Sequence, residues 1–459
     1  MDQTQDEASG SASEPGRAPL LFVVLEADRP LARGARYSLA GVESVTIGRG
    51  DARTLARSAD GKYLEVRIPG RWMSSRHASL RAVGGEWILE DASSRNGTFV
   101  EGDRVTSRVL HEGDVVEAGR TYFLVRGAPA ADAPLVRDED GERSAQSFGL
   151  RTLLPELQES LSALRRVAQR STVPVLLMGA TGAGKEVLAR EVHAQSGRQG
   201  AFVAVNCGAL PGNLVESLLF GHVKGAFSGA LRDEPGLVRA AAGGTLLLDE
   251  IGDLPATSQA ALLRVLQEHE VVPVGATRPV RVDVRVVAAT HRPLEQLAAS
   301  GAFRLDLLAR LKGYVHTVPA LRERTADLGV ILADVLEKVA GERARRLALA
   351  PEAARALLAY DWPLNVRELQ QAMASAVALA TDNVIEARHL PADVLAPPGE
   401  EPPESAAEAD GGLRDRLVAL LYDNRGNVAA VASAMGKAPA QIHRWMRRFS
   451  IDPDVYRTG

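Results

Sequence analysis

Three patterns of apolar and polar positions follow one another along the chain. From about residue 20 to residue 127, short alternating runs such as 44–47, 77–82 and 86–90 are separated by Gly, Asp and Asn. Alternation with a period of two buries one face of a strand, and Gly84-Gly85 fits a hairpin turn between two of these runs. Strands at a spacing of about ten residues predict an all-β sandwich.

The second pattern covers residues 148–395, where apolar runs of strand length alternate with runs of helical period, as in an α/β domain. The third lies in residues 412–459 and predicts two short helices, the first ending at Gly436 and the second beginning at Pro439. Their inward positions are Val428, Val431, Ala432 and Met435, then Ile442, Trp445, Met446 and Phe449. We therefore expect a multidomain protein that ends in a small all-α helix-turn-helix.

Polar segments separate these domains. We expect a disordered tail at residues 1–19, a linker at 128–147 and an acidic linker at 396–411, because large apolar residues are scarce there. The single cysteine, Cys207, allows no intramolecular disulfide, and no run of ~18 apolar residues occurs. The polar, acidic N-terminal segment leads us to expect no signal peptide. We expect a cytoplasmic protein without a membrane span.

The distribution of charge distinguishes the C-terminal segment from the rest of the chain. The formal net charge is −4, but residues 412–459 carry eight Lys and Arg against four Asp. A short basic helical unit in an acidic chain favours a nucleic-acid-binding module.

A glycine-rich segment, residues 179–185, joins the apolar run 173–178 to the helical run 186–193. Strand, glycine loop, Lys185 and helix form the arrangement that cradles phosphate groups in a P-loop. Glu186 occupies the position where Ser or Thr would bind Mg²⁺. A plain glycine-rich turn before a helix is the alternative.

An acidic motif follows the glycine-rich segment. The apolar strand 244–248 ends in Asp249 and Glu250, and Asp249 lies 64 residues after Lys185. In a Walker B motif, Asp249 holds the water shell of Mg²⁺ and Glu250 polarises the attacking water. Without a P-loop at this spacing, a helix N-cap would be the better interpretation of the pair.

The sandwich resembles a forkhead-associated (FHA) domain, over residues 20–127. That family's signature is met by Gly48-Arg49, by Ser74 and His77, and by residues 94–98. Because the family binds phosphothreonine peptides, the resemblance implies that Arg49 and Ser74 contact phosphate, with Arg76 as a weaker second cation. It also implies that Asn96 holds the peptide backbone and that His77 braces the loop. The alternative is a set of plain sandwich turns that binds an unphosphorylated partner.

The second resemblance lies between the two nucleotide motifs. The segment Gly225, Ala226, Phe227, Ser228, Gly229, Ala230 is similar to the Gly-Ala-Phe-Thr-Gly-Ala loop of bacterial enhancer-binding proteins, the AAA+ activators of sigma-54 RNA polymerase. In that family the loop extends on ATP binding and pushes on sigma-54. Leu218, Val223 and Ser228 depart from the family pattern, and a surface hairpin without a partner is the alternative.

This resemblance implies an AAA+ core at residues 148–320, a helical lid at 321–395 and a homo-hexamer. It assigns Asn206 as a restraint on Glu250, and Arg304 and Arg310 as arginine fingers that act on a neighbouring subunit, where such a finger is worth ~10³ or more in rate. An internal salt bridge from Arg304 to Asp306 is the alternative. The implied ATP-contacting residues are Gly179, Ala180, Thr181, Gly182, Ala183, Gly184, Lys185, Glu186 and Arg367.

The C-terminal unit is similar to the Fis-type helix-turn-helix that closes many enhancer-binding proteins. Gln and Arg side chains on its second helix suit base edges, and the other basic residues suit phosphates. The expected DNA contacts are Lys437, Gln441, Arg444, Arg447 and Arg448. The alternative is a basic helix face that makes oligomer contacts.

Together these features predict a sigma-54-dependent transcriptional activator. It would hydrolyse ATP with Mg²⁺ to remodel the closed complex of sigma-54 RNA polymerase while bound to upstream promoter DNA. A phosphothreonine protein, either a Ser/Thr kinase or its substrate, would control it. Two alternatives stay open: an AAA+ remodeller of another target, and a non-enzymatic DNA-binding regulator that uses ATP as an assembly ligand.

Overall fold

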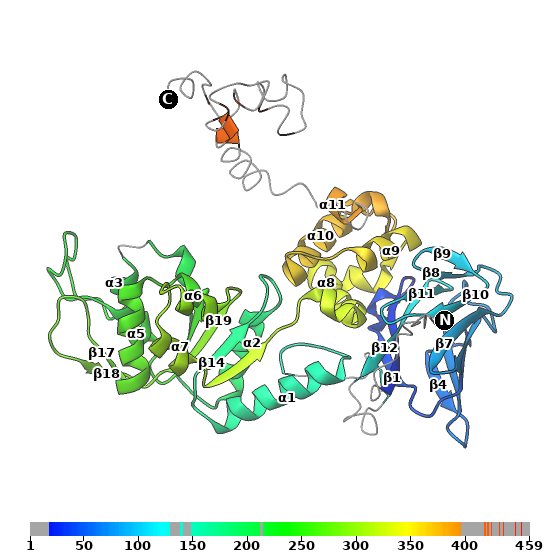
Figure 1. The fold of residues 1–459 in the computed structure, drawn as a ribbon, viewed down its shortest axis with the longest axis horizontal. Coiled ribbons are helices and arrows are strands. Elements are labelled where there is room, and N and C mark those ends of the chain that lie inside the picture. The colour runs from blue at the N-terminus through cyan, green and yellow to red at the C-terminus, as the bar shows by residue number, and fades with distance from the viewer. Residues whose placement is uncertain are drawn as a thin grey trace, which may run out of the picture. The chain divides into compact units, whose positions relative to one another are not determined.

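The computed structural model describes residues 18–128, 138–140, 148–211 and 214–395, with scattered positions between 417 and 451. Residues 1–391 form one compact unit and residues 392–459 another (Figure 1). No helix among the described residues is long and apolar enough to cross a membrane.

The N-terminal part is the predicted β-sandwich. One sheet has the order β13 (Glu139–Asp140), β2 (Ala35–Ser38), β1 (Ala18–Glu26), β12 (Thr121–Ala128), β11 (Val115–Ala118), β8 (Thr98–Val100), β9 (Asp103–Val105). The other has the order β10 (Ser107–Leu110), β7 (Glu86–Asp91), β6 (Ala78–Val83), β3 (Ser44–Arg49), β5 (Tyr63–Ile68), β4 (Thr54–Arg57). Alternate residues from both sheets fill one core, and the hairpin β6–β7 turns at Gly84-Gly85 as its sequence predicts.

Strand β13 lies inside the segment that the sequence analysis treated as a linker. Its Asp140 pairs with the buried Arg53, which also holds Glu26 at 2.9 Å. Burying an arginine requires carboxylate partners, so these ion pairs fix a short polar segment that carries no apolar strand signal.

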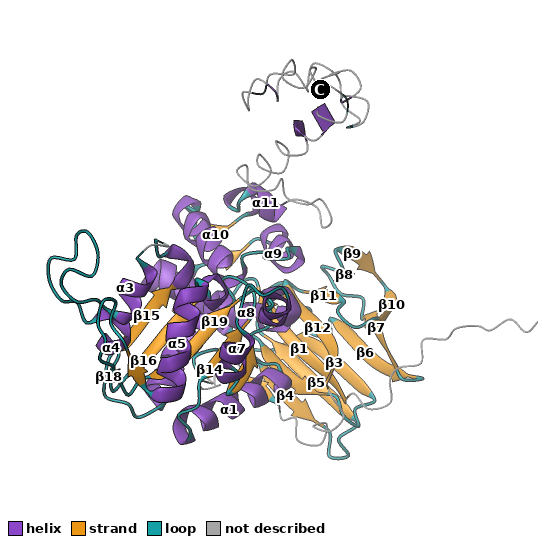
Figure 2. Ribbon diagram, turned by 60° about the vertical axis from the view of Figure 1, so that its left-hand side comes forward, coloured by secondary structure: helices purple, strands orange, loops and turns teal. Residues whose placement is uncertain are grey.

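The α/β core has a parallel sheet in the order β15 (Phe202–Asn206), β16 (Thr245–Asp249), β19 (Arg285–Thr290), β14 (Val175–Met178), β20 (Tyr314–Thr317). Its helices, labelled in Figure 1 and Figure 2, are α1 (Pro155–Arg170), α2 (Lys185–Gln195), α3 (Val215–Phe220), α4 (Gly236–Ala240), α5 (Ala256–Glu268), α6 (Leu294–Ala299) and α7 (Leu305–Leu311). A hairpin of β17 (Glu270–Val271) and β18 (Val280–Arg281) follows α5. All residues of β19 are buried, as expected of a central parallel strand.

The helical lid contains α8 (Leu328–Ala340), α9 (Pro351–Ala359) and α10 (Asn365–Leu379), with β21 (Ala348–Leu349) paired to β22 (Val384–Ile385). Helix α11 (Ala392–Leu395) begins the second unit. The α/β core with its lid confirms the predicted architecture of the central part.

The sandwich docks on the lid, which its sequence does not reveal. A Cβ added at Gly329 of α8 would lie 1.9 Å from the carbonyl oxygen of Val24 in β1, so only glycine permits this approach. Arg33 adds ion pairs to Asp334 and, at 2.6 Å, to Glu337 of the same helix.

A buried carboxylate fastens the start of the AAA+ core to the lid. Asp327 accepts hydrogen bonds from the Thr152 hydroxyl and the Leu153 backbone N–H, both at 2.7 Å. Burial raises the pKa of Asp327 to about 6. These contacts join segments about 175 residues apart, so no local sequence pattern predicts them.

In the second unit, Leu417, Leu421, Val431 and Met446 form a buried cluster, with Met435 packed against it. Val431, Met435 and Met446 are three of the positions predicted to face inward. The other predicted inward positions and all five expected DNA contacts lie outside the described residues.

Candidate functional site

The glycine-rich loop, the end of β16 and the start of α10 line one cavity of about 450 Å³. Gly179, Gly182 and Gly184 have φ values of +148°, +75° and +113°, which non-glycine residues rarely adopt. The loop then enters α2 at Lys185, so backbone N–H groups and a helix N-terminus surround the cavity. The predicted residues that line it include residues 181–186, Asn206, Asp249, Glu250 and Arg367.

Lys185 folds back on its own loop. Its Nζ donates to the carbonyl oxygens of Gly179 at 2.7 Å and Ala180 at 3.2 Å. Burial lowers the pKa of Lys185, and the neighbouring Glu250 and Asp249 carboxylates act against that shift. The lysine is therefore a cation placed where a polyphosphate would enter.

Asp249 and Glu250 end β16 at the cavity. Burial, reinforced by the charge of Glu250, raises the pKa of Asp249, so a cation beside it would relieve an unfavourable charge. Within the described part of the chain, no group of three or more His, Cys, Asp or Glu could hold a metal by itself. The residues fit Mg²⁺ that is shared with phosphate oxygens and water, which is how this ion is commonly held.

His291, directly after β19, holds Glu250. Its Nδ1 lies 2.8 Å from Oε2 of Glu250, and its backbone N–H lies 3.4 Å from the same oxygen. Glu250 has φ of +50°, a strained value for a non-glycine residue. Asn206, expected to restrain Glu250, lines the same cavity, and its Oδ1 accepts from the N–H groups of Gly208 and Ala209 in the short turn after β15. Its restraint on Glu250 stays a prediction. The resemblance to enhancer-binding proteins also puts His291 at the end of the family's sensor I strand without indicating a partner, and the fold supplies Glu250 as that partner.

We expect His291→Ala to lower kcat for ATP hydrolysis about tenfold, equivalent to ~1.4 kcal/mol, with little change in KM. The reason is that Glu250 loses the group that orients it. His291→Asn retains a side-chain donor and should recover most of the rate. Steady-state ATPase assays check this, and an unchanged kcat in the alanine variant would show that His291 does not position Glu250.

The lid closes directly on the P-loop through Asn365. Its Nδ2 donates to the carbonyl of Thr181 at 2.9 Å, and its Oδ1 accepts from the Leu321 N–H at 2.7 Å. Asn365 is 1% exposed and has φ of +57°, which asparagine tolerates better than most residues. The resemblance to enhancer-binding proteins includes Asn365 in the family's sensor II segment, at residues 360–369, and the fold makes it the link between lid and loop.

The two candidate arginine fingers lie outside the cavity of their own chain. Arg304 is exposed and pairs with Asp306 at 2.7 Å, which is the internal ion pair given above as the alternative. Arg310 is exposed at the end of α7. A role in a neighbouring subunit stays a prediction for both.

The 225–230 loop forms a tight turn between two glycines in left-handed conformations. The N–H of Gly225 donates to the carbonyl of Ala230 at 2.9 Å. The ring of Phe227 lies 5.0 Å from that of His222, and its side chain is 37% exposed. Leu231, directly after the loop, is 83% exposed. The turn thus presents apolar side chains to solvent, which suits a protein contact.

The FHA loops come together as predicted from their motifs. His77 is fully buried; its Nδ1 accepts from the Ser74 N–H, so its Nε2–H donates to the Gly97 carbonyl at 3.0 Å. Burial lowers the pKa of His77, which keeps this bridge neutral. Arg49 is exposed, and Asn96 donates to the Trp72 carbonyl at 2.6 Å.

Comparison with known sequences tests these interpretations. Residues 151–316 match the Sigma-54 interaction domain, residues 322–407 the AAA+ ATPase lid domain and residues 45–119 the FHA domain. The hydrogenase transcriptional regulatory protein HoxA of Cupriavidus necator is 41% identical over 339 residues, which cover 70% of each chain. The chain belongs to the sigma-54-dependent transcriptional regulators. It is a sigma-54-dependent activator with an AAA+ domain and an FHA domain, so the recognised family is confirmed.

Other members of this family are also similar. The transcriptional regulatory protein GlrR of Escherichia coli is 39% identical over 342 residues, which cover 73% of each chain. The crystal structure of NtrX from Brucella abortus in complex with ADP has a TM-score of 0.50 and 30% identity, covering 66% of this chain and 70% of that one.

Proposed function

We propose that this activator hydrolyses ATP in the cavity between P-loop, β16 and lid, and uses the cycle to remodel the closed complex of sigma-54 RNA polymerase. The observation that carries the proposal is the convergence of Lys185, Asp249, Glu250 and Arg367 on one cavity of about 450 Å³. The NtrX relative, whose structure covers 66% of this chain, was solved with ADP.

Each residue has a distinct task in this proposal. Lys185 and the glycine-loop N–H groups bind the β and γ phosphates, and Arg367 reaches them from the lid. Asp249 holds Mg²⁺, which when bound neutralises charge on those phosphates. Glu250, oriented by His291, accepts a proton from the attacking water.

A ring completes the site. Arg304 or Arg310 of a neighbouring subunit stabilises charge on the γ-phosphate, which requires an oligomer, and the family resemblance implies a homo-hexamer. Breaking the Arg304–Asp306 ion pair to contact a phosphate costs little free energy, because both side chains are about half exposed. The C-terminal unit tethers the ring to upstream promoter DNA through residues 437–448.

The regulatory input enters through the FHA domain. Arg49, Ser74, Arg76 and Asn96 bind a phosphothreonine peptide of a partner protein, a Ser/Thr kinase or its substrate. Peptide binding needs to bias the ring by only ~1–3 kcal/mol to control it.

Arg49→Ala should weaken binding of a phosphothreonine peptide about 100-fold, since charge-assisted hydrogen bonds to phosphate are worth ~1.5–3 kcal/mol. Isothermal titration calorimetry with a randomised phosphothreonine peptide pool measures this loss. Arg81→Ala serves as the control, because Arg81 is exposed on β6 and paired with Glu90. Unaltered affinity in the Arg49 variant would instead support an unphosphorylated partner.

Transcription in vitro from a sigma-54 promoter, with ATP or a non-hydrolysable analogue, tests the main proposal. Full-length transcript is expected only with hydrolysable ATP. Vigorous ATP turnover without transcript would favour an AAA+ remodeller of another target.

A further inference from the structure

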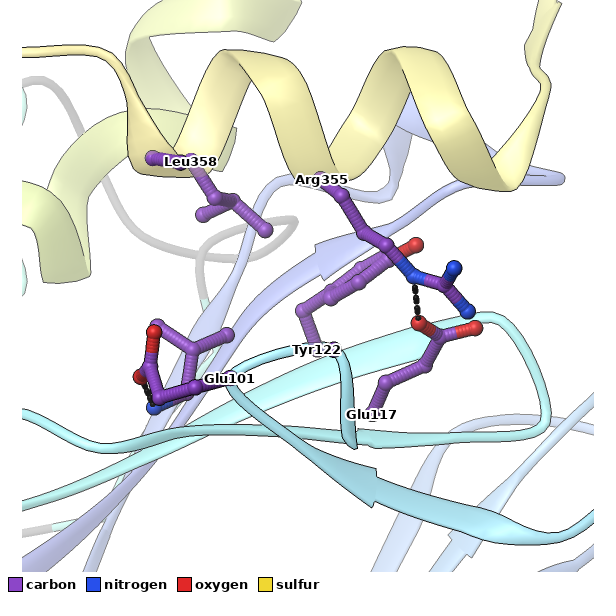
Figure 3. A pocket seen from close by; sticks show the side chains of 8 residues that line it. Glu101, Glu117, Tyr122, Arg355 and Leu358 are labelled. Carbon is purple, nitrogen blue, oxygen red and sulfur yellow. Dashed lines mark hydrogen bonds and ion pairs between the residues drawn. The ribbon is translucent and has the colours of Figure 1, made fainter. Parts of the chain in front are cut away.

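Cavities follow the contact between the FHA domain and helix α9 of the lid. One of about 120 Å³ lies between Glu117 and Tyr122 of the sandwich and Arg355 and Leu358 of α9 (Figure 3). The next, of about 220 Å³, is lined by Trp72 and Asn96 on the FHA side and by Glu352 on the lid side. We call this second cavity the FHA–lid cleft.

The FHA–lid cleft is continuous with the phosphopeptide loops. Asn96, the expected anchor of the peptide backbone, forms part of its wall and donates to the carbonyl of Trp72. Two guanidinium groups lie over the indole of Trp72, that of Arg71 at 5.0 Å and that of Arg120 at 3.9 Å from the ring centroid. A peptide held at Asn96 therefore has a ready path toward the first turn of α9.

The phosphopeptide loops at one end of this path are basic, whereas the lid end carries an exposed carboxylate. The phosphopeptide loops carry four exposed arginines, none in an ion pair with any described residue: Arg49, Arg71, Arg76 and Arg95. Such a basic surface suits a phosphate dianion.

The arginines inside the cleft are already neutralised. Arg355 pairs with Glu117 at 2.7 Å, and Arg120 pairs with Asp28 at 3.2 Å. Glu352 is exposed and lines both this cleft and a further cavity of about 520 Å³ that Arg120 also lines. It forms no ion pair with the residues that the structure describes. Its carboxylate is thus the charge available for a ligand at the lid end.

We propose that the FHA–lid cleft binds residues that flank the phosphothreonine, and that Glu352 selects a lysine or arginine among them. This inference rests on the proposed FHA function. The peptide then touches the lid as well as the FHA domain, so its binding free energy depends on the lid position. The same lid holds Asn365 on the P-loop, which connects peptide recognition to the nucleotide site.

The test uses the full-length protein and phosphothreonine peptides with alanine flanks. Lysine or glutamate replaces one flanking alanine at a time, and fluorescence anisotropy measures each affinity. We expect at least one position where lysine binds about fivefold tighter than glutamate at low salt, with the difference shrinking as ionic strength rises. Glu352→Lys should reverse this preference, and Glu352→Gln should remove it.

Thermal unfolding establishes that both variants fold, which is expected because Glu352 is exposed. Arg49→Ala separates the two proposals. If Arg49→Ala abolishes binding while both Glu352 variants keep the wild-type charge preference, the cleft is not a subsite and the FHA proposal stands. If Arg49→Ala binds every peptide as the wild type does, the FHA proposal itself fails.

Discussion

Replacing Glu250 with Gln is expected to lower kcat for ATP hydrolysis by about 10²–10⁴-fold, because the amide cannot accept a proton from the attacking water. ATP affinity should change little, since Lys185 and the glycine loop supply the phosphate contacts. The hydrogen bond to His291 can persist through the amide oxygen, so the fold around β16 should be preserved. Steady-state ATPase assays and nucleotide-binding titrations separate the two effects.

Glu268→Gln is a suitable control, because Glu268 is exposed at the end of α5 and does not line the cavity. The control should hydrolyse ATP at the wild-type rate. A Glu250→Gln protein that retained wild-type turnover would remove the proposed mechanism and would leave Glu250 as a structural residue.

Replacing Phe227 with Ala is expected to reduce sigma-54-dependent transcription at least tenfold while ATP turnover stays within about twofold of the wild type. An exposed aromatic anchor at a protein contact is typically worth ~2 kcal/mol or more. Phe227 lies outside the nucleotide cavity, so its loss leaves the hydrolytic residues untouched. In vitro transcription and ATPase assays on one preparation measure both quantities.

Leu379→Ala controls for the loss of an exposed apolar side chain, since Leu379 is 56% exposed at the end of α10. It should support normal transcription. If Phe227→Ala also transcribed normally, the loop would not be the element that meets sigma-54. The departures at Leu218, Val223 and Ser228 would then favour another target.

The sequence predicts the individual domains because their signals are local. Alternation identified the hairpin β6–β7, glycine spacing identified the P-loop, and the His77 bridge follows from a short motif. These features depend on residues near one another in the chain, where period and turn chemistry suffice.

Contacts between domains could not be predicted in the same way. In the sequence, nothing distinguishes Gly329 from other helix positions. The structure shows that no larger residue fits there, because the helix backbone closely approaches the Val24 carbonyl. Similarly, Glu250 and His291 are 41 residues apart, and their pairing depends on β16 and β19 lying side by side in the sheet. The sequence gives no signal for this pairing, whereas the role of Asn206 beside Glu250 rests on the family resemblance and stays a prediction.

The proposed regulatory cleft is another feature that the sequence of a single domain does not predict. Each domain was recognised from its own motifs, yet their docking creates the cleft that places Glu352 near Asn96. A linear motif cannot encode such a shared site, because its two walls are about 250 residues apart in sequence.

Permanganate footprinting of promoter melting tests the central claim most directly. With the activator, sigma-54 holoenzyme and ATP, thymines near the start site should become reactive. They should stay unreactive when Glu250→Gln or Phe227→Ala replaces the wild-type protein. Melting that proceeds equally well with Glu250→Gln, or without hydrolysable ATP, would contradict the claim that hydrolysis at this cavity drives the remodelling.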